Sequence, residues 1–183
     1  MRGEQRTVCI LGEAGIGKSR LSFEFCNGLE DERLFFLEGH CAADTKETPF
    51  APLIEIVRRA FQIDGDATSG EAEHRFDQGL AFLDLDRSEN LPYLINLLGY
   101  PSGDVDFDKI AGETLSIRTR DAVFAMLLER CKISPTILIV EDLQWADGAT
   151  LALLKRIVES NDGPPLLTIT TARTGYATPW SGQ

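Results

Sequence analysis

The chain has 183 residues, a length that suits one domain with a substantial hydrophobic core. Hydrophobic residues make up 43% of it and charged residues 26%, which is typical of an ordinary globular protein. The net charge of −11 argues against nucleic-acid binding by this chain, because contacts with phosphates need a basic face. No apolar stretch is long enough for a signal peptide or a membrane span, so we expect a cytoplasmic protein without membrane contacts.

The four cysteines are scattered and form no C-x-x-C pair. Cys9 falls in an apolar run and Cys131 ends an apolar helical face, so we expect buried free thiols in preference to disulfides or metal ligands. His40 and His74 are too isolated in the sequence to complete a metal site with the cysteines.

The most informative stretch is GEAGIGKS at residues 12–19, which fits the pattern G-x-x-x-x-G-K-[ST]. Residues 7–11 before it form a β-branched apolar run, typical of a buried parallel strand. Residues 20–29 after it carry Leu21, Phe25 and Leu29 on one face of a helix. A phosphate-binding loop requires this order of strand, loop and helix, so the sequence predicts a nucleoside triphosphate site.

Each part of this loop has an expected chemical role. Glycines let the backbone turn tightly and aim its N–H groups at an anion, and the following helix adds partial positive charge. Lys18 is expected to reach the β- and γ-phosphates, and the Ser19 hydroxyl to bind Mg²⁺. The predicted nucleotide-binding residues are Gly12, Glu13, Ala14, Gly15, Ile16, Gly17, Lys18, Ser19 and Arg20.

A second strand is expected over residues 33–37, and roughly a hundred residues then pass before the next one, far more than a crossover helix needs. Helical periodicity recurs in this interval, on apolar faces that begin at Phe50, Ala72, Leu91 and Ile117. Ser69 is a candidate N-cap for the second of these helices. The pattern predicts a helical insertion between strands two and three, within the same domain.

Two further strands are predicted at residues 136–140 and 166–171, with an amphipathic helix over residues 147–159 between them. Strands that alternate with helices indicate an α/β fold with a mainly parallel sheet, in which ligands bind outside the carboxyl ends of the strands. The phosphate loop, the acids after the third strand and Arg173 all follow strand ends, so we expect them to meet in one cleft. The last ten residues are expected to fray.

Glu141 and Asp142 form the acidic pair of the predicted site. One carboxylate would hold Mg²⁺ beside the Ser19 hydroxyl, and the other would orient or deprotonate the attacking water. Position favours Glu141 for the metal and Asp142 for the water, but adjacent side chains at a strand end point in different directions, and the roles could be exchanged. Arg173 would contact the γ-phosphate and stabilise its charge, with a structural surface arginine as the alternative.

Other residues near this pair have structural explanations. Asp147 is expected to cap the helix that follows. Trp145 is expected to pack in the fold or to edge the cleft, and Arg118 and Arg120 to be ordinary charges on a helix surface.

Three runs of the sequence resemble one family of ATPases. ILIVEDLQWADGATLALL is similar to the acidic-strand signature of the signal-transduction ATPases with numerous domains, the STAND class, which is close to the AAA+ ATPases. GEAGIGKSRL resembles the phosphate loop of that class, and TITTAR resembles its sensor strand. The relatives it resembles are ATPase modules of large regulators, some with a class III adenylate/guanylate cyclase domain and others with a LuxR-type helix-turn-helix.

This resemblance implies a three-layer P-loop fold that binds ATP with Mg²⁺ and hydrolyses it slowly as a conformational switch. It assigns catalytic roles to Lys18, Glu141, Asp142 and Arg173, and metal contacts to Ser19, Glu141 and Asp142. The order Glu then Asp departs from relatives with Asp first, so the catalytic assignment stays open. The expected regions are 1–41 for the loop and second strand, 42–134 for the helical insertion, 135–174 for the acidic and sensor strands, and 175–183 for a frayed end.

Relatives continue into a fifth strand and a lid that this sequence does not include, so we expect a fragment of a larger regulator. ATP, ADP and the other domains of that regulator are the expected partners, and self-association is left open. Slow hydrolysis of ATP to ADP is the preferred activity. A nucleotide-gated interaction module with negligible turnover and a small-molecule kinase are the alternatives.

Overall fold

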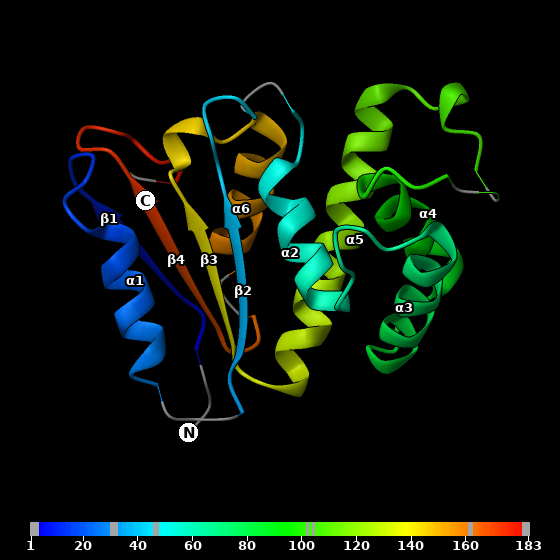
Figure 1. Cartoon of the computed structure of the whole chain (residues 1–183), viewed down its shortest axis with the longest axis horizontal. Coiled ribbons are helices and arrows are strands. Elements are labelled where there is room, and N and C mark those ends of the chain that lie inside the picture. The colour runs from blue at the N-terminus through cyan, green and yellow to red at the C-terminus, as the bar shows by residue number, and fades with distance from the viewer. Residues whose placement is uncertain are drawn as a thin grey trace.

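The computed structural model describes residues 4–29, 33–45, 48–101, 103, 105–160 and 163–180. Within these residues the chain forms a four-stranded parallel sheet and six α-helices, which confirms the expected α/β class (Figure 1). The strands are β1 Arg6–Leu11, β2 Phe35–His40, β3 Thr136–Glu141 and β4 Leu166–Ala172. The helices are α1 Lys18–Asn27, α2 Ala51–Phe61, α3 Ser69–Phe82, α4 Arg87–Leu97, α5 Gly112–Ile133 and α6 Gly148–Glu159, with short 3₁₀ turns at Phe107–Lys109 and Leu143–Trp145.

The strands lie in the order β1-β4-β3-β2, and each pair is parallel. β3 occupies a central position, and every residue in it is buried. This burial explains its uninterrupted apolar run. A strand that is covered on both faces has no side chains facing solvent, so polar residues do not alternate with apolar ones along it. The parallel arrangement brings the carboxyl ends of β1, β3 and β4 to one edge of the sheet.

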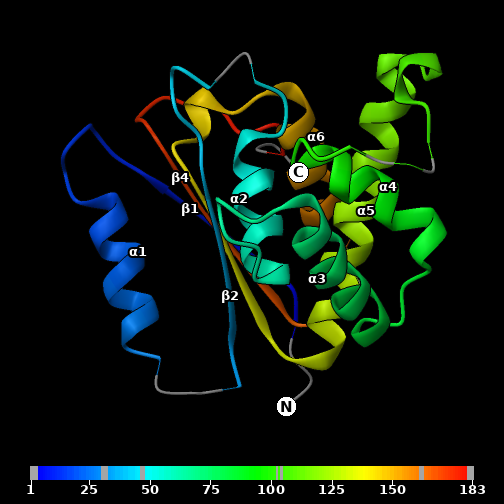
Figure 2. The ribbon, with the colours of Figure 1, turned by 45° about the vertical axis from the view of Figure 1, so that its right-hand side comes forward.

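Helices cover the two faces of the sheet unequally. α1 packs on one face, where Cys26 and Leu29 contact a small cluster of Ile137, Ile139 and Ile169. The main core lies on the other face, where α2, α5 and α6 pack against side chains such as Leu138 from β3. Figure 2 shows the sheet between α1 and this larger group of helices.

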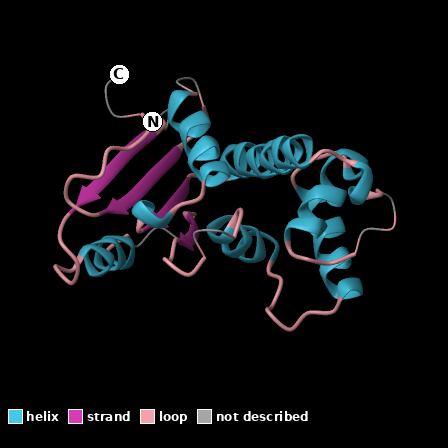
Figure 3. Ribbon diagram, turned by 90° about the horizontal axis from the view of Figure 1, so that it is seen from above, coloured by secondary structure: helices cyan, strands magenta, loops and turns pink. Residues whose placement is uncertain are grey.

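The helical insertion between β2 and β3 comprises α2, α3, α4 and α5. α2 packs on β2, while α3 and α4 pack on each other and α4 packs on α5. Figure 3 shows the outer helices beside the sheet instead of over it. Phe61 of α2 and Phe76 of α3 join them through rings whose centroids are 4.7 Å apart. The insertion therefore extends the main core sideways from the sheet.

The second strand begins and ends later than the sequence indicates. Residues 33 and 34 lie outside it, and it continues through Glu38 and Gly39 to His40, which pairs in register with Glu141. A Cβ atom at Gly39 would lie 2.4 Å from the carbonyl oxygen of Pro52, so glycine is needed for α2 to pack against the strand. The sequence predicts an end at residue 37, because the pairing of residues 38–40 with β3 is not visible in local sequence.

The apolar face predicted for the first helix is wrong in part. α1 turns Ser22 and Cys26 towards the sheet, whereas Leu21 and Phe25 are 58% and 43% exposed. The helix starts directly from the phosphate loop, so the loop sets its rotation. Hydrophobic periodicity alone does not contain that constraint.

The caps of two other helices were predicted with different success. Asp147 caps α6 as expected, accepting hydrogen bonds from the backbone N–H groups of Ala149 and Thr150 at 2.9 and 3.0 Å. Ser69 does not cap α3, because Thr68 occupies that position in a capping box with Glu71.

The apolar face predicted for α5 is also wrong at one residue, because Ile117 is 42% exposed.

The end of the chain is more ordered than expected. Tyr176 and Trp180 pack against the main core, and Thr178 is buried. Residues 181–183, the rest of the segment expected to fray, lie outside the described residues. All four cysteines are free thiols, as predicted, but only Cys41 and Cys131 are buried, whereas Cys9 and Cys26 are partly exposed. In the described part of the chain, no helix is both long and apolar enough to cross a membrane.

The capping box gives the first testable prediction. Thr68→Ala removes the acceptor of the Glu71 N–H, so we expect the free energy of unfolding to fall by about 1 kcal/mol in urea denaturation. Ser69→Ala is the matched control, and its effect should stay within about 0.5 kcal/mol. A larger loss in Ser69→Ala than in Thr68→Ala would contradict the assigned cap.

The same box predicts a pH dependence. Hydrogen bonds from the backbone and side chain of Thr68 lower the pKa of Glu71, so the ionised carboxylate stabilises the fold. This contribution is present above the pKa of Glu71 in the unfolded chain and is lost as the pH falls through its lower folded value. The stability difference between wild type and Thr68→Ala should therefore narrow in acid.

Candidate functional site

The carboxyl ends of three strands meet around a cleft of about 290 Å³. β1 leads into the predicted phosphate loop, β3 into the acidic pair and β4 into Arg173, as expected for a parallel sheet. Most of the predicted loop and strand-end residues line the cleft together. The lining residues are Ala14, Gly15, Gly17, Lys18, Ser19, Arg20, Asp142, Gln144, Trp145 and Arg173.

Not every predicted residue faces this cleft. Gly12, Glu13 and Ile16 belong to the loop but not to the lining, and Ile16 is 71% exposed. Glu141 is also absent from the lining, and only 6% of it is exposed. The structure thus separates the loop residues that enclose the cleft from those that shape the turn around it.

Two glycines give the loop its conformation. Gly15 and Gly17 have φ values of 77° and 101°, in the left-handed region that other residues rarely adopt. Gly17 stands at the N-cap position of α1, and no side chain of the described residues caps the helix there. The first backbone N–H groups of α1 are therefore open to an external acceptor, and the helix dipole favours an anion in that place.

Lys18 lies across the loop. Its Nζ donates hydrogen bonds to the carbonyl oxygens of Gly12 and Glu13, at 3.1 and 3.2 Å. These bonds hold the ammonium group over the loop, where the backbone turns. The charged oxygens of a bound phosphate would be stronger acceptors for this ammonium group than the two carbonyl oxygens are.

Ser19 and Glu141 form a side-chain contact between the phosphate loop and the end of β3. The Ser19 hydroxyl donates a hydrogen bond of 2.8 Å to Oε2 of Glu141, across 122 residues of sequence. Both groups offer hard oxygen ligands, which suit Mg²⁺ when phosphates and waters complete its coordination. In the described part of the chain, no three His, Cys, Asp or Glu side chains form a metal site by themselves. The arrangement fits a metal that arrives with a nucleotide.

Asp142 adopts a conformation different from that of its neighbour. Its φ of 57° turns the backbone sharply after β3, and its N–H donates to the Thr171 hydroxyl at 2.9 Å. The turn places Asp142 in the cleft, while Glu141 stays buried beneath it beside Ser19. The two acids therefore occupy distinct positions, which the sequence could not separate.

Gln144 is a site residue that the sequence analysis missed. Its Nε2 donates to Oδ1 of Asp142 at 2.9 Å, and its Oε1 accepts from the backbone N–H of Arg173 at 3.1 Å. One side chain thus holds the ends of β3 and β4 together. The guanidinium of Arg173 lies 5.4 Å from the ring centroid of Trp145, which confirms Trp145 as a cleft-edge aromatic.

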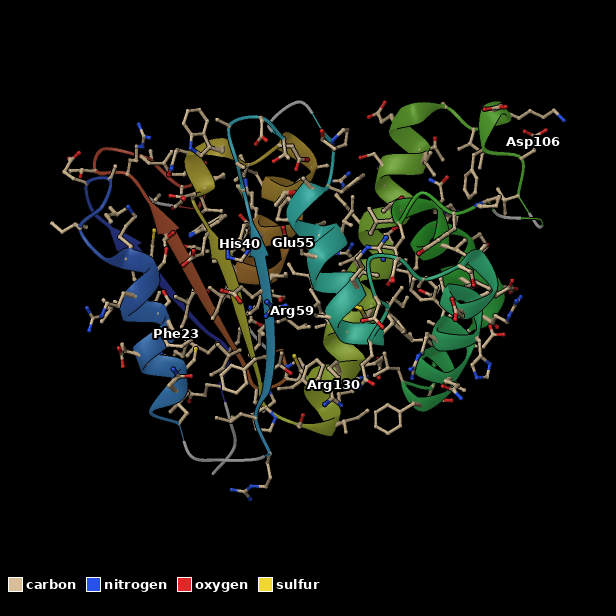
Figure 4. All side chains as sticks on the ribbon, in the orientation of Figure 1. Phe23, His40, Glu55, Arg59, Asp106 and Arg130 are labelled. Carbon is tan, nitrogen blue, oxygen red and sulfur yellow. The ribbon has the colours of Figure 1, made fainter. Side chains whose placement is uncertain are left out.

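His40 is the second residue that was missed. At the end of β2 its Nε2 lies 3.7 Å from Oε2 of Glu141, and its Nδ1 lies 2.8 Å from Oε2 of Glu55 in α2 (Figure 4). Burial opposes protonation of the ring, but the hydrogen bond to Glu55 and the charges of Glu55, Glu38 and Glu141 outweigh it and raise the pKa of His40. The prediction for His40 concerned only a metal site with the cysteines, and its contacts with Glu55 and Glu141, which are distant in sequence, were not anticipated.

Cys41, the next residue, is buried and chemically quiet. Burial raises the pKa of its thiol to about 12, and the charges of Asp147, Asp142 and Glu55 act in the same direction. The thiolate form is therefore scarce at neutral pH, which makes Cys41 unsuitable as a nucleophile.

The contact between Ser19 and Glu141 is testable by substitution. Ser19→Ala removes the hydroxyl donor to a buried carboxylate, so we expect the free energy of unfolding to fall by about 1 kcal/mol without nucleotide. Ser22→Ala, in the same helix, removes only a 3.3 Å bond to the carbonyl of Lys18 and should cost less than about 0.5 kcal/mol. Equal losses in the two variants by urea denaturation would contradict a stabilising role for this contact.

Comparison with known proteins agrees with this geometry. The chain is 25% identical, over 98% of its length, to a protein of Rhizobium meliloti (strain 1021) described only as uncharacterized. It spans 17% of the length of that relative. Residues 1–169 match the family model described as the AAA ATPase domain. A match over most of the chain, together with the phosphate loop and acidic strand end, shows that the chain belongs to the AAA ATPase domain family.

Proposed function

We propose that this chain binds ATP with Mg²⁺ and hydrolyses it slowly, as the switch of a larger signalling or transcriptional regulator. One observation carries the proposal: Lys18, Ser19, Asp142 and Arg173 line one cleft at an uncapped helix N-terminus, and the Ser19 hydroxyl donates a hydrogen bond to Glu141, which is buried beneath the cleft. Membership of an AAA ATPase family supports nucleotide binding and hydrolysis as the general activity.

The chain's own groups account for phosphate binding. The open N–H groups at the start of α1 would donate hydrogen bonds to phosphate oxygens, and Lys18 would exchange its two carbonyl contacts for charged oxygens. Ser19 and Glu141 would hold Mg²⁺, with the carboxylate acting directly or through water. The metal would supply positive charge that offsets the negative charge of the β- and γ-phosphates.

Hydrolysis would depend on positioning around the γ-phosphate. Asp142 lines the cleft and orients the attacking water, while Glu141 lies beside the Ser19 hydroxyl and serves the metal. Arg173 lies at the cleft edge over Trp145, from which its guanidinium can contact the γ-phosphate and stabilise developing charge. Gln144 fixes the distance between Asp142 and the backbone of Arg173.

The regulatory part of the proposal rests on two further points. The chain corresponds to 17% of the length of its Rhizobium relative, so a module of this kind occurs within a much larger protein. The acidic strand and sensor strand resemble those of STAND-class regulators. We accordingly assign residues 1–41 and 135–174 to the ATPase centre and residues 42–134 to an insertion in the same domain.

Phosphate release by two variants tests the mechanism. Asp142→Asn should reduce Mg²⁺-dependent phosphate release about 100-fold or more while leaving ATP affinity within a few-fold of wild type. Glu141→Gln should instead weaken ATP binding and its dependence on Mg²⁺. Asp108→Asn, on the exposed 3₁₀ turn of the insertion, is the control and should behave as wild type. The opposite pattern for the two acids would exchange their assigned roles.

One observation favours a second candidate function. The amide of Gln144 already donates a hydrogen bond to Oδ1 of Asp142, so that oxygen is less available to an attacking water. The chain would then be a nucleotide-gated interaction module in which ATP stabilises one conformation without turnover. In this case purified protein retains intact ATP for hours and wild type releases no more phosphate than Asp142→Asn.

A further inference from the structure

A second cavity lies at the opposite end of β2 from the phosphate loop. It has a volume of about 350 Å³ and lies between α2, α3, α5 and the start of β2. The lining residues are Phe35, Leu37, Ala60, Phe61, Gln62, Arg75, Gln78, Gly79, Phe82, Leu83, Met126 and Arg130. None of them belongs to the proposed nucleotide site. Its volume falls in the range of small-molecule pockets.

The walls of this cavity are mainly apolar and are held by close packing. Leu37, Phe61 and Met126 belong to the main core. A Cβ atom at Gly79 would lie 2.3 Å from the ring of Phe61, so α3 approaches α2 more closely than any larger residue would permit. The cavity is therefore built into the junction of three helices and a strand.

Arg130 brings a positive charge to these apolar walls. The central carbon of its guanidinium lies 3.8 Å from the ring centroid of Phe35 and 5.9 Å from that of Phe82. Its Nε is buried and has no hydrogen-bond partner. Burial lowers the pKa of Arg130 from its ordinary high value, yet a guanidinium stays charged at neutral pH. A buried donor on a charged group without an acceptor is costly unless a ligand supplies one.

The charge around this cavity differs from that of the whole protein. Arg75 and Arg130 both line it, and the lining contains no Asp or Glu, although the chain has a net charge of −11. No ion pair joins either arginine to an acid of the described residues. Two arginines over an apolar chamber match a molecule with one anionic end and an apolar body.

We propose that this cavity binds a small organic anion, a carboxylate attached to an aliphatic or aromatic body, with Arg130 and Arg75 at the carboxylate. Phe35, Phe61 and Met126 would contact the apolar body. The proposal concerns a second site and does not depend on nucleotide binding.

Two structural elements run from the cavity towards Glu141, which lies beneath the proposed nucleotide site. β2 starts at Phe35 in the cavity and ends at His40 beside Glu141. α2 carries Glu55, which contacts His40, and ends at Phe61 in the cavity wall. In Figure 4, Arg130, which belongs to α5, lies well below His40 and Glu55. The proposed organic anion would therefore lie at one end of α2 and β2, and the acidic end of β3 lies at the other.

Methionine methyl resonances give a site-specific test. The sequence contains two methionines, Met1 and Met126, and Met126 lines the cavity, so protein labelled with ¹³C at the methionine methyl groups reports on it directly. Octanoate is the probe, and octanamide, of the same length without charge, is its neutral control. In nucleotide-free protein, octanoate should shift the Met126 signal saturably, and octanamide should bind at least tenfold more weakly.

Two arginine variants separate charge recognition from general effects. Arg130→Gln should weaken octanoate binding at least tenfold and abolish the preference over octanamide. Arg156→Gln is the matched control, because Arg156 also lies over a phenylalanine ring, at 4.0 Å from Phe124, but outside this cavity and paired with Asp121. Arg156→Gln should bind octanoate as wild type does.

A second variant keeps the test decisive if Arg130→Gln does not fold. Arg75 is exposed, so Arg75→Gln should fold normally and weaken octanoate binding about threefold. An unmoved Met126 signal at saturating octanoate would overturn the proposal. Equal binding of octanoate and octanamide, or wild-type affinity in both Arg75→Gln and Arg130→Gln, would overturn it as well.

Discussion

The hydrogen bond from Ser19 to Glu141 joins the phosphate loop to the centre of the sheet across 122 residues of sequence, and it links the proposed metal site to the fold. In the rotation that α1 adopts after the phosphate loop, the face that carries Ser19, Ser22 and Cys26 lies towards the strands. The same rotation leaves Leu21 and Phe25 exposed. The residue that would meet Mg²⁺ thus lies on the side of the first helix that faces the sheet, so the proposed site and the packing of α1 share one face.

The insertion between β2 and β3 has a different relation to the site. It holds most of the helical core, yet it reaches the acidic strand end through Glu55 and His40. His40 lies where three carboxylates converge, so it offsets their repulsion next to Glu141. The organic-anion cavity lies at the other end of these elements. α2 and β2 therefore run between the proposed organic-anion cavity and the acidic strand end beneath the proposed nucleotide site.

Local sequence predicts the features that depend on local chemistry. The buried run of β3, the glycine loop and the Asp147 cap follow from strand propensity, backbone freedom and helix-end hydrogen bonding. The later bounds of β2, the inward face of α1 and the roles of His40 and Gln144 depend on contacts between distant segments. No periodicity within one element encodes those contacts. The predicted nucleotide and metal contacts stay predictions, although the fold brings most of their residues to one cleft.

Calorimetric titration of ATP tests the central claim most directly, with and without Mg²⁺, on wild type and Lys18→Ala. Lys109→Ala is the control, because Lys109 is 83% exposed on the insertion and pairs with Asp106. We expect Mg²⁺-dependent binding in wild type and Lys109→Ala, and at least tenfold weaker binding in Lys18→Ala. A folded wild-type chain that does not bind ATP, or a Lys18→Ala variant with wild-type affinity, would contradict the account.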